Sequence, residues 1–305
     1  MTTTVLVAGA TGDIGSRISR ELLSHDVRLR VLTRPGSSAA AELFGDDRRV
    51  EVVTADYADH DALVAAASGV DVVVSAVSGI RPVIVDAQRA LLAAAVAAGV
   101  PRFLPSDYSA DYRRLTPGTN RNLELRREFA ADLDAAPIQA TSVLNGMFTE
   151  LLAGQAPMIL RDRKRVLFWS SADQMLDVTT KDDTARTVAL VALDSDAPRV
   201  VEVAGDRITA RQVAELASEL SGETFKLQWA GTTRTLSAMA AVGRRLSRDP
   251  DETFPAWQGM QYFVSMFSGE GELRHVDNER YGRQTWTTAR DILKPWLTGT
   301  GTPAA

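Results

Sequence analysis

Cysteine is absent from the 305 residues of this sequence, and histidine occurs only three times. The lack of cysteine excludes a disulfide framework, a thiolate metal site and a cysteine nucleophile. No two histidines have the spacing of metal ligands, so we expect no metal site. The sequence also lacks a run of ~18 apolar residues and the basic and apolar regions of a secretory signal. These absences favour a cytoplasmic protein in a reducing compartment, with no membrane partner.

Lysine is also scarce. Lysine and arginine together number 34, but only four are lysines, and none of these precedes residue 164. Any chemistry that needs a titratable amine therefore has few candidates. A net charge of −5 argues against a nucleic-acid partner. The 45% hydrophobic and 24% charged residues are typical of globular proteins, and the length allows two domains.

The first half of the chain alternates short β-branched runs with helical segments. This alternation predicts an α/β fold, a doubly wound (Rossmann) parallel sheet with strand order 3-2-1-4-5-6. Such a sheet binds its ligand at the carboxyl ends of its strands. The expected strands are 4–8, 27–33, 50–54, 70–75, 102–106 and 138–144, and the expected helices are 16–23, 59–67, 83–98 and 120–133.

The second half has a different pattern. We expect residues 1–150 to form the NAD(P)-binding domain. Residues 151–305 are expected to form a smaller, mainly helical substrate-binding part, some of whose segments return to the sheet. In this part, Thr180 and Thr209 are candidate helix caps.

A glycine-rich turn joins the first strand to the first helix, in the sequence Gly9-Ala-Thr-Gly-Asp-Ile-Gly15. Glycines at this junction let backbone N–H groups approach a pyrophosphate, and the helix N-terminus adds a favourable dipole. We therefore predict a dinucleotide site. Its candidate residues are Gly9, Thr11, Gly12, Asp13, Ile14 and Gly15, with Ser75, Ala76 and Val77 at the end of the fourth strand.

Arg34 follows the second strand, where NAD-binding folds usually carry an acidic residue for the ribose hydroxyls. An arginine there is able to pair with a 2′-phosphate, so NADP(H) is the expected cofactor, although a plain surface arginine is the alternative. Asp56 ends the third strand, where it either meets the adenine or caps the next helix.

Three segments resemble the NmrA-like and isoflavone reductase-like atypical short-chain dehydrogenases. They are the glycine turn, Thr33-Arg34 and Phe103-Leu-Pro-Ser-Asp-Tyr108. Leu123-Glu-Leu-Arg-Arg127 and Ser142-Val-Leu-Asn-Gly-Met-Phe148 are also similar to segments of that family. The resemblance covers roughly residues 4–225 and implies NADPH-dependent reduction of small aromatic or enone-type molecules. Some relatives bind the cofactor as regulators without turnover.

The sequence departs from the family at one position. Reductases of the family carry a lysine shortly before the Arg-Arg pair, and Asn122 occupies that place here. Asparagine donates a hydrogen bond but has no proton to transfer at neutral pH. The Tyr-x-x-x-Lys pair of ordinary short-chain dehydrogenases is also missing. The catalytic candidates are then Ser106 and Tyr108, which either polarise a carbonyl or play structural parts, and Asn122, which either orients substrate or faces solvent.

Asn145, Met147 and Phe148 leave the sixth strand, and we expect them to line a substrate pocket unless they belong to the core. His275 lies in the polar segment 269–278, a possible lid.

The leading hypothesis is an NADPH-dependent oxidoreductase for a small, partly aromatic or enone- or imine-type molecule. One alternative is a non-catalytic NADP(H) sensor that binds a protein partner, and another is a non-redox isomerase or lyase. The sequence leaves the oligomeric state open.

Overall fold

The computed structural model describes residues 2–45, 47–249, 251–282 and 284–300. The chain forms two compact units, each assembled from segments that are distant in sequence. Unit 1 comprises Met1–Tyr108, Leu125–Val143 and Thr184–Val201, and unit 2 comprises Ser109–Glu124, Leu144–Asp183 and Glu202–Ala305. The assignment of residues 1–150 to cofactor binding and 151–305 to substrate binding stays a prediction.

Unit 1 contains a six-stranded parallel sheet with the order β3-β2-β1-β4-β5-β6, which confirms the predicted fold and strand order. The apolar, β-branched strands at its centre are fully buried, as expected where helices cover both faces. Its strands are β1 (Thr3–Ala8), β2 (Val27–Thr33), β3 (Val50–Thr54), β4 (Val72–Ser75), β5 (Arg102–Leu104) and β6 (Gln139–Ala140).

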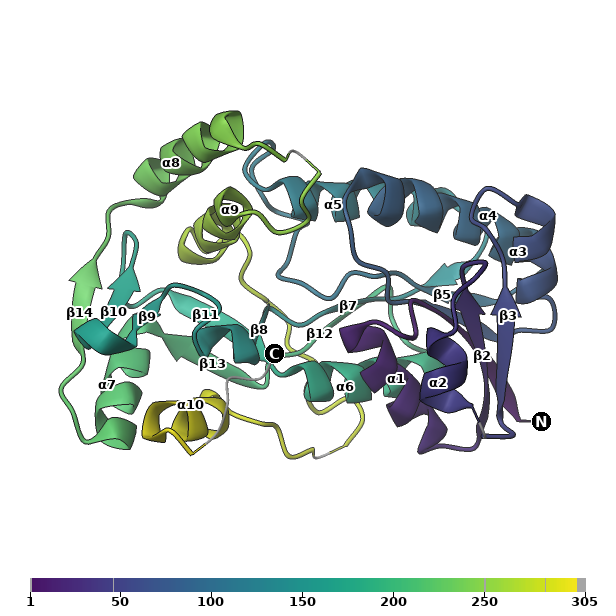
Figure 1. Ribbon diagram of the computed structural model, residues 1–305, viewed down its shortest axis with the longest axis horizontal. Coiled ribbons are helices and arrows are strands. Elements are labelled where there is room, and N and C mark those ends of the chain that lie inside the picture. Colours follow the sequence, from purple (N-terminus) through teal and green to yellow (C-terminus); the bar gives the residue numbers. More distant parts are fainter. Residues whose placement is uncertain (1, 46, 250, 283, 301–305) are drawn as a thin grey trace. The chain divides into compact units, whose positions relative to one another are not determined.

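Helices lie on both faces of this sheet (Figure 1). Leu63 of α3, Leu91 of α4 and Phe129 of α5 pack with the sheet in one apolar cluster. Helices α1 and α2 lie on the opposite face, together with the part of α6 that belongs to unit 1. Their bounds are α1 (Asp13–Leu23), α2 (Ala39–Phe44), α3 (His60–Ala67), α4 (Gln88–Ala97), α5 (Arg121–Ala135) and α6 (Lys181–Leu193).

Several elements of unit 1 differ from the sequence prediction: α2 was not expected, α1 begins at Asp13 rather than residue 16, and β4 begins at Val72 rather than residue 70. The fifth strand ends at Leu104 rather than residue 106, because Pro105 has no N–H for the ladder. The helix expected over 83–98 starts as the π-helix η1 (Pro82–Ala87) and continues as α4. The expected sixth strand is two strands: β6 pairs with β5, whereas β7 (Ser142–Leu144) pairs with β12 (Val200–Glu202).

Unit 2 has the expected helical C-terminal region and, in addition, two small sheets with the orders β14-β10-β9 and β13-β11-β8. One apolar cluster joins these sheets to the helices, with Trp169, Phe263 and Phe267 in ring contact. The strands are β8 (Met147–Phe148), β9 (Ile159–Leu160), β10 (Arg165–Phe168), β11 (Met175–Thr179), β13 (Asp206–Thr209) and β14 (Lys226–Trp229). The helices are the 3₁₀ turns η2 (Thr149–Leu152) and η3 (Arg161–Arg163), α7 (Ala210–Ser221), α8 (Thr233–Leu246), α9 (Ala256–Phe267) and α10 (Ala289–Thr298).

Both predicted caps are confirmed. The Thr180 hydroxyl accepts the N–H of Asp183 in the first turn of α6, and Thr209 forms a capping box with Gln212 at the start of α7. Within the described ranges, no helix combines the length and the apolar character needed to cross a bilayer.

Candidate functional site

Backbone conformation and packing within the protein require glycine at the first and third glycine positions of the turn. Gly9 has φ +80°, and a Cβ there would lie 2.6 Å from the Ala76 carbonyl oxygen. A Cβ at Gly15 would lie 2.0 Å from the Gly9 carbonyl oxygen. These two glycines therefore make the tight turn and the close packing of α1 on β1 possible.

Gly12 is different, because an added Cβ there would meet a single protein atom, in a tight contact rather than a severe clash. It is exposed, its φ is −75°, and the nearest atom to an added Cβ would be the Gly9 oxygen at 3.3 Å. Gly12 is also the N-cap of α1, and no side chain caps this helix. The first N–H groups of a helix have no partner within it, so this end offers donors to an anion that approaches closely.

Arg34 lies at the exit of β2, as the sequence predicts, and its side chain is exposed. No carboxylate within the described ranges pairs with its guanidinium. It does act on the half-buried phenol of Tyr57 after β3: burial raises the pKa of Tyr57 to about 12, and the Arg34 charge lowers it in part. The exposed Arg34 cation at the exit of β2 is therefore near enough for its charge to reach Tyr57 after β3.

Asp56 is exposed at the exit of β3, where its Oδ1 accepts the N–H of Ala58 at 2.9 Å. The cap of α3 is Asp59 instead, whose side chain accepts the N–H of Ala62. The capping role considered for Asp56 is therefore wrong, since its side chain shapes the turn before the cap. Its contact with adenine stays a prediction.

The segment Ser75–Val77 lies beside the glycine turn, because Ala76 and Val77 both border the space above Gly9. Two hydroxyls from the β5 exit hold this segment. Tyr108 Oη donates to the Ser75 carbonyl at 2.8 Å, and Ser106 Oγ donates to the Val77 carbonyl at 2.7 Å. The hydroxyl protons of both catalytic candidates are thus engaged by the backbone of the predicted cofactor segment.

Tyr108 is buried, and burial raises the pKa of its phenol well above its usual value, with a further contribution from the Asp107 charge. A buried phenol that donates to a carbonyl is a poor source of a proton for another group. This geometry favours the structural alternative for Tyr108 over a proton-transfer role.

Asn122 is 1% exposed, so the solvent-facing alternative is wrong. Its Nδ2 donates to the Thr253 carbonyl at 3.0 Å, and its Oδ1 accepts from Arg121 Nε at 2.9 Å. The guanidinium of Arg121 also donates to the Thr253 carbonyl and lies over the Trp257 ring. Both polar atoms of Asn122 therefore take part in holding the segment before α9 within unit 2.

Asn145 is fully buried, and both polar atoms of its side chain lack a hydrogen-bond partner within the described part of the chain. Its backbone is held on both sides: its N–H donates to Ser109, and its carbonyl accepts from the Thr179 hydroxyl. Met147 is half-buried against the unit 2 core, as the core alternative predicts, and Phe148 is half-buried in β8. Of these three residues, Asn145 is the one whose side chain has a hydrogen-bond donor and acceptor left for a ligand.

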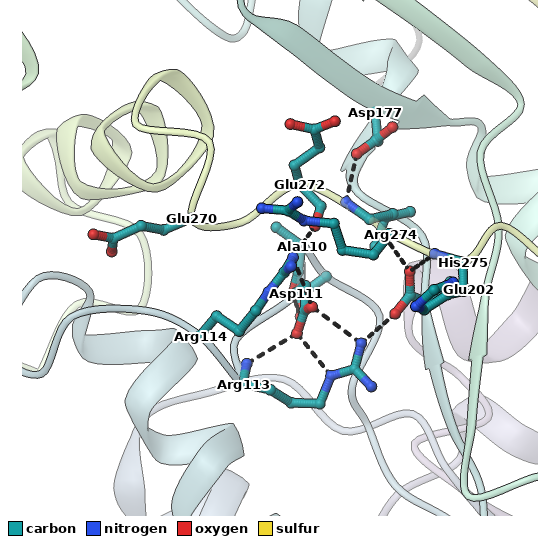
Figure 2. A network of polar contacts seen from close by, with 12 residues as sticks. Ala110, Asp111, Arg113, Arg114, Asp177, Glu202, Glu270, Glu272, Arg274 and His275 are labelled. Carbon is teal, nitrogen blue, oxygen red and sulfur yellow. Dashed lines mark hydrogen bonds and ion pairs between the residues drawn. The ribbon is translucent and has the colours of Figure 1, made fainter.

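The segment 269–278, considered as a lid, is fastened to unit 2 by buried carboxylates (Figure 2). Asp177 Oδ2 accepts the N–H of Leu273 at 2.7 Å, and Glu202 Oε2 accepts the N–H groups of Arg274 and His275. Burial raises the pKa of Asp177 even though Leu273 and Arg207 donate to its carboxylate. His275 is thus held through its backbone.

Gln88, a buried glutamine that contacts the backbone of Ser106, was not among the residues predicted from the sequence. A signal was present, because Gln88 shares the helical face of Ile84, Leu91 and Leu92, which are apolar. Among the residues that the structure describes, no group of three or more His, Asp or Glu side chains is placed to hold a metal ion.

Comparison with known proteins identifies relatives of this chain. Pinoresinol reductase 1 of Arabidopsis thaliana is 33% identical over 201 residues, which are 61% of this chain and 63% of that protein. This chain therefore spans less than two thirds of that relative's length. A structure of AtPrR2 with NADP+ and (+)pinoresinol superposes with a TM-score of 0.79 at 23% identity, over 97% of this chain and 99% of the other.

A leucoanthocyanidin reductase from Vitis vinifera, solved as a binary complex with NADPH, gives a TM-score of 0.78 at 19% identity, over 96% of this chain and 99% of the other. At these identities the superpositions show a shared fold. The model of the NmrA-like family matches residues 1–249, which is most of the chain. Together with the glycine turn and the strand order, this match shows that the chain belongs to the NmrA-like family.

Proposed function

We propose that this protein is an NADPH-dependent oxidoreductase that reduces a small, partly aromatic or enone- or imine-type organic molecule. The observation that carries the proposal is Gly12, an exposed glycine with an ordinary φ at a helix N-terminus that no side chain caps. A dinucleotide pyrophosphate needs this close approach of backbone N–H groups. The relatives support the proposal, because one is a pinoresinol reductase and two of the solved structures contain NADP+ or NADPH.

The residues of unit 1 fit this cofactor. The turn at Gly12 would bind the pyrophosphate through backbone N–H groups, and Arg34 would pair with the 2′-phosphate. When bound, NADPH supplies the hydride for the reduction. Ser106 and Tyr108 hold the segment Ser75–Val77 in place through their hydroxyls.

Asn145 supports the substrate part of the proposal. Its carboxamide is able to donate and accept at the same time, and a buried carboxamide without partners costs free energy. A substrate hydroxyl or carbonyl would satisfy it, and a donated N–H would stabilise negative charge that develops on a carbonyl oxygen. Asn122 already has partners in unit 2, so we assign it a positioning role there.

The test is NADPH consumption, followed by loss of nicotinamide absorbance with a panel of quinones, enones and imines. Turnover with members of this panel is the expected result. Tight NADPH binding without consumption across the panel would contradict the reductase and favour the NADP(H) sensor, for which the missing lysine is the motivating observation. Conversion of a substrate without net NADPH loss would favour a non-redox isomerase or lyase.

Arg34→Ala tests the choice of cofactor. Removing a charge-assisted contact with the 2′-phosphate costs about 1.5–3 kcal/mol, so the Kd for NADPH should rise roughly tenfold to a hundredfold. The Kd for NADH, which has no such phosphate, should change little. Isothermal titration with the two cofactors gives both values, and equal losses would remove Arg34 from the site.

Tyr108→Phe separates a structural hydroxyl from a catalytic one. The variant loses the hydrogen bond to Ser75, so the Kd for NADPH should rise about fivefold while kcat at saturating cofactor stays within about threefold. A general acid would behave differently, because its loss lowers kcat by about 10²–10⁴ and removes a limb of the pH–rate profile. Steady-state kinetics across pH distinguishes these results, and a large fall in kcat would make Tyr108 the proton donor.

A further inference from the structure

Gln88 is a buried polar residue at the point where η1 becomes α4, and its side chain is 1% exposed. Its Nε2 donates to the Ile84 carbonyl in the π-helix at 2.7 Å, and its Oε1 accepts the N–H of Ser106 at 3.0 Å. The two partners fix the orientation of the amide, because the carbonyl requires a donor and the N–H requires an acceptor. Gln88 thus ties the start of α4 to the exit of β5.

Ser106 links Gln88 to the segment after β4 by a second hydrogen bond. The same residue whose N–H is held by Gln88 donates its hydroxyl to the Val77 carbonyl at 2.7 Å. Ser106 is 3% exposed; its bond from Gln88 is buried, and its bond to the Val77 carbonyl is partly buried. The side chain of Gln88 is therefore joined through one residue to the segment after β4.

That segment lies against the glycine turn. A Cβ on Gly9 would lie 2.6 Å from the Ala76 oxygen and 3.1 Å from the Val77 nitrogen, so the two backbones are in contact there. A shift of Val77 would move the backbone at the carboxyl ends of β1 and β4. These strand ends are the topological switch point, where open α/β sheets bind their ligands.

We propose that Gln88 is a positioning residue for the cofactor site, acting through Ser106 on the segment Ser75–Val77. This inference rests on the proposed function. Arg34 places the adenosine half of NADPH at the exit of β2, so the other half extends along the strand ends towards β4 and β5. Gln88 therefore supports the binding of the nicotinamide half.

The experiment compares two ligands, NADPH and adenosine 2′,5′-bisphosphate, which has the adenosine half of NADPH with its 2′- and 5′-phosphates and lacks the nicotinamide half. Gln88→Leu removes both hydrogen bonds, and we expect the Kd for NADPH to rise about tenfold. The Kd for adenosine 2′,5′-bisphosphate should stay within about twofold, because the exit of β2 is untouched. Gln88→Glu keeps an acceptor for Ser106 and, because burial favours the protonated carboxyl, an O–H donor for the Ile84 carbonyl, so it should restore most of the NADPH affinity.

Leu92→Ala is the matched control, since Leu92 lies on the same helix, is buried in the apolar cluster and has no polar group. It should lower Tm at least as much as Gln88→Leu while leaving both Kd values near those of the wild type. If Gln88→Leu does not fold, Ser106→Ala reports the same pattern, because it removes the bond to Val77.

Equal weakening of both ligands, or an NADPH affinity unchanged in a folded Gln88→Leu, would overturn the positioning role. These results differ from a failure of the proposed function, in which the wild-type protein itself does not bind NADPH. That outcome would overturn both.

Discussion

Gly12→Ala should fold like the wild-type protein and bind NADPH roughly tenfold to a hundredfold more weakly. The added methyl group would make one tight contact, 3.3 Å from the Gly9 carbonyl oxygen, which a shift of a few tenths of an ångström relieves, and the φ of −75° suits any residue. The loss of a glycine N-cap costs less than about 1 kcal/mol, so Tm should stay within about 3 °C. The methyl group would, however, occupy space that a bound pyrophosphate needs, and one lost charge-assisted hydrogen bond accounts for the expected change.

Gly15→Ala is the matched control within the same turn, and its expected result is the reverse. A Cβ there would lie 2.0 Å from the Gly9 oxygen, which belongs to backbone that cannot move aside cheaply. We expect a loss of at least about 3 kcal/mol in the free energy of unfolding. Thermal melts and NADPH titrations of both variants are the measurements. A Gly12→Ala protein with wild-type affinity would show that the cofactor does not approach this turn.

Asn145→Leu should raise the free energy of unfolding and also raise KM for the substrate. Leucine has the same branched arrangement of heavy atoms as asparagine, and it removes two buried polar groups that have no partners in the described structure. The free energy of unfolding should therefore rise by about 1–3 kcal/mol. If the carboxamide binds substrate, KM should rise about tenfold as well, because that interaction is lost.

Asn120→Leu provides the comparison, since Asn120 is equally buried but its side chain is fully engaged. Its Oδ1 accepts from Leu123 and Gln258, and its Nδ2 donates to Ser265. The same substitution there should lower stability by about 1–3 kcal/mol. Chemical denaturation of both variants measures the contrast. Destabilisation by Asn145→Leu would mean that a structural water satisfies Asn145, and the residue would then carry no argument for substrate binding.

The missing lysine removes the family's usual proton donor, but reduction by NADPH with another donor is still open to the protein. Lys181 is the first residue of α6. It is buried, and its backbone N–H donates to the Glu150 carboxylate. The side chain of Asn122 donates a hydrogen bond to the Thr253 carbonyl within unit 2. An Asn122→Lys protein would have to bury a charge at that place, so recovery of a standard reductase by this single change is not expected.

The sequence by itself determined the sheet of unit 1 and the glycine turn. Alternating apolar runs, helix periodicity and the right-handed crossover rule are local or general properties, so the order of six strands follows from them. The positions of Gly12 and Arg34 at strand exits follow from the same pattern.

Only the tertiary structure decided what the polar side chains do. The sixth strand divides because β12, from about 60 residues further along the chain, pairs with its second part. The partners of Tyr108, Ser106 and Gln88 lie 33, 29 and 18 residues away in the chain, and local periodicity carries no information about such contacts. Asn122 and Asn145 are both buried asparagines, and they differ only in whether the fold brings a partner to the carboxamide.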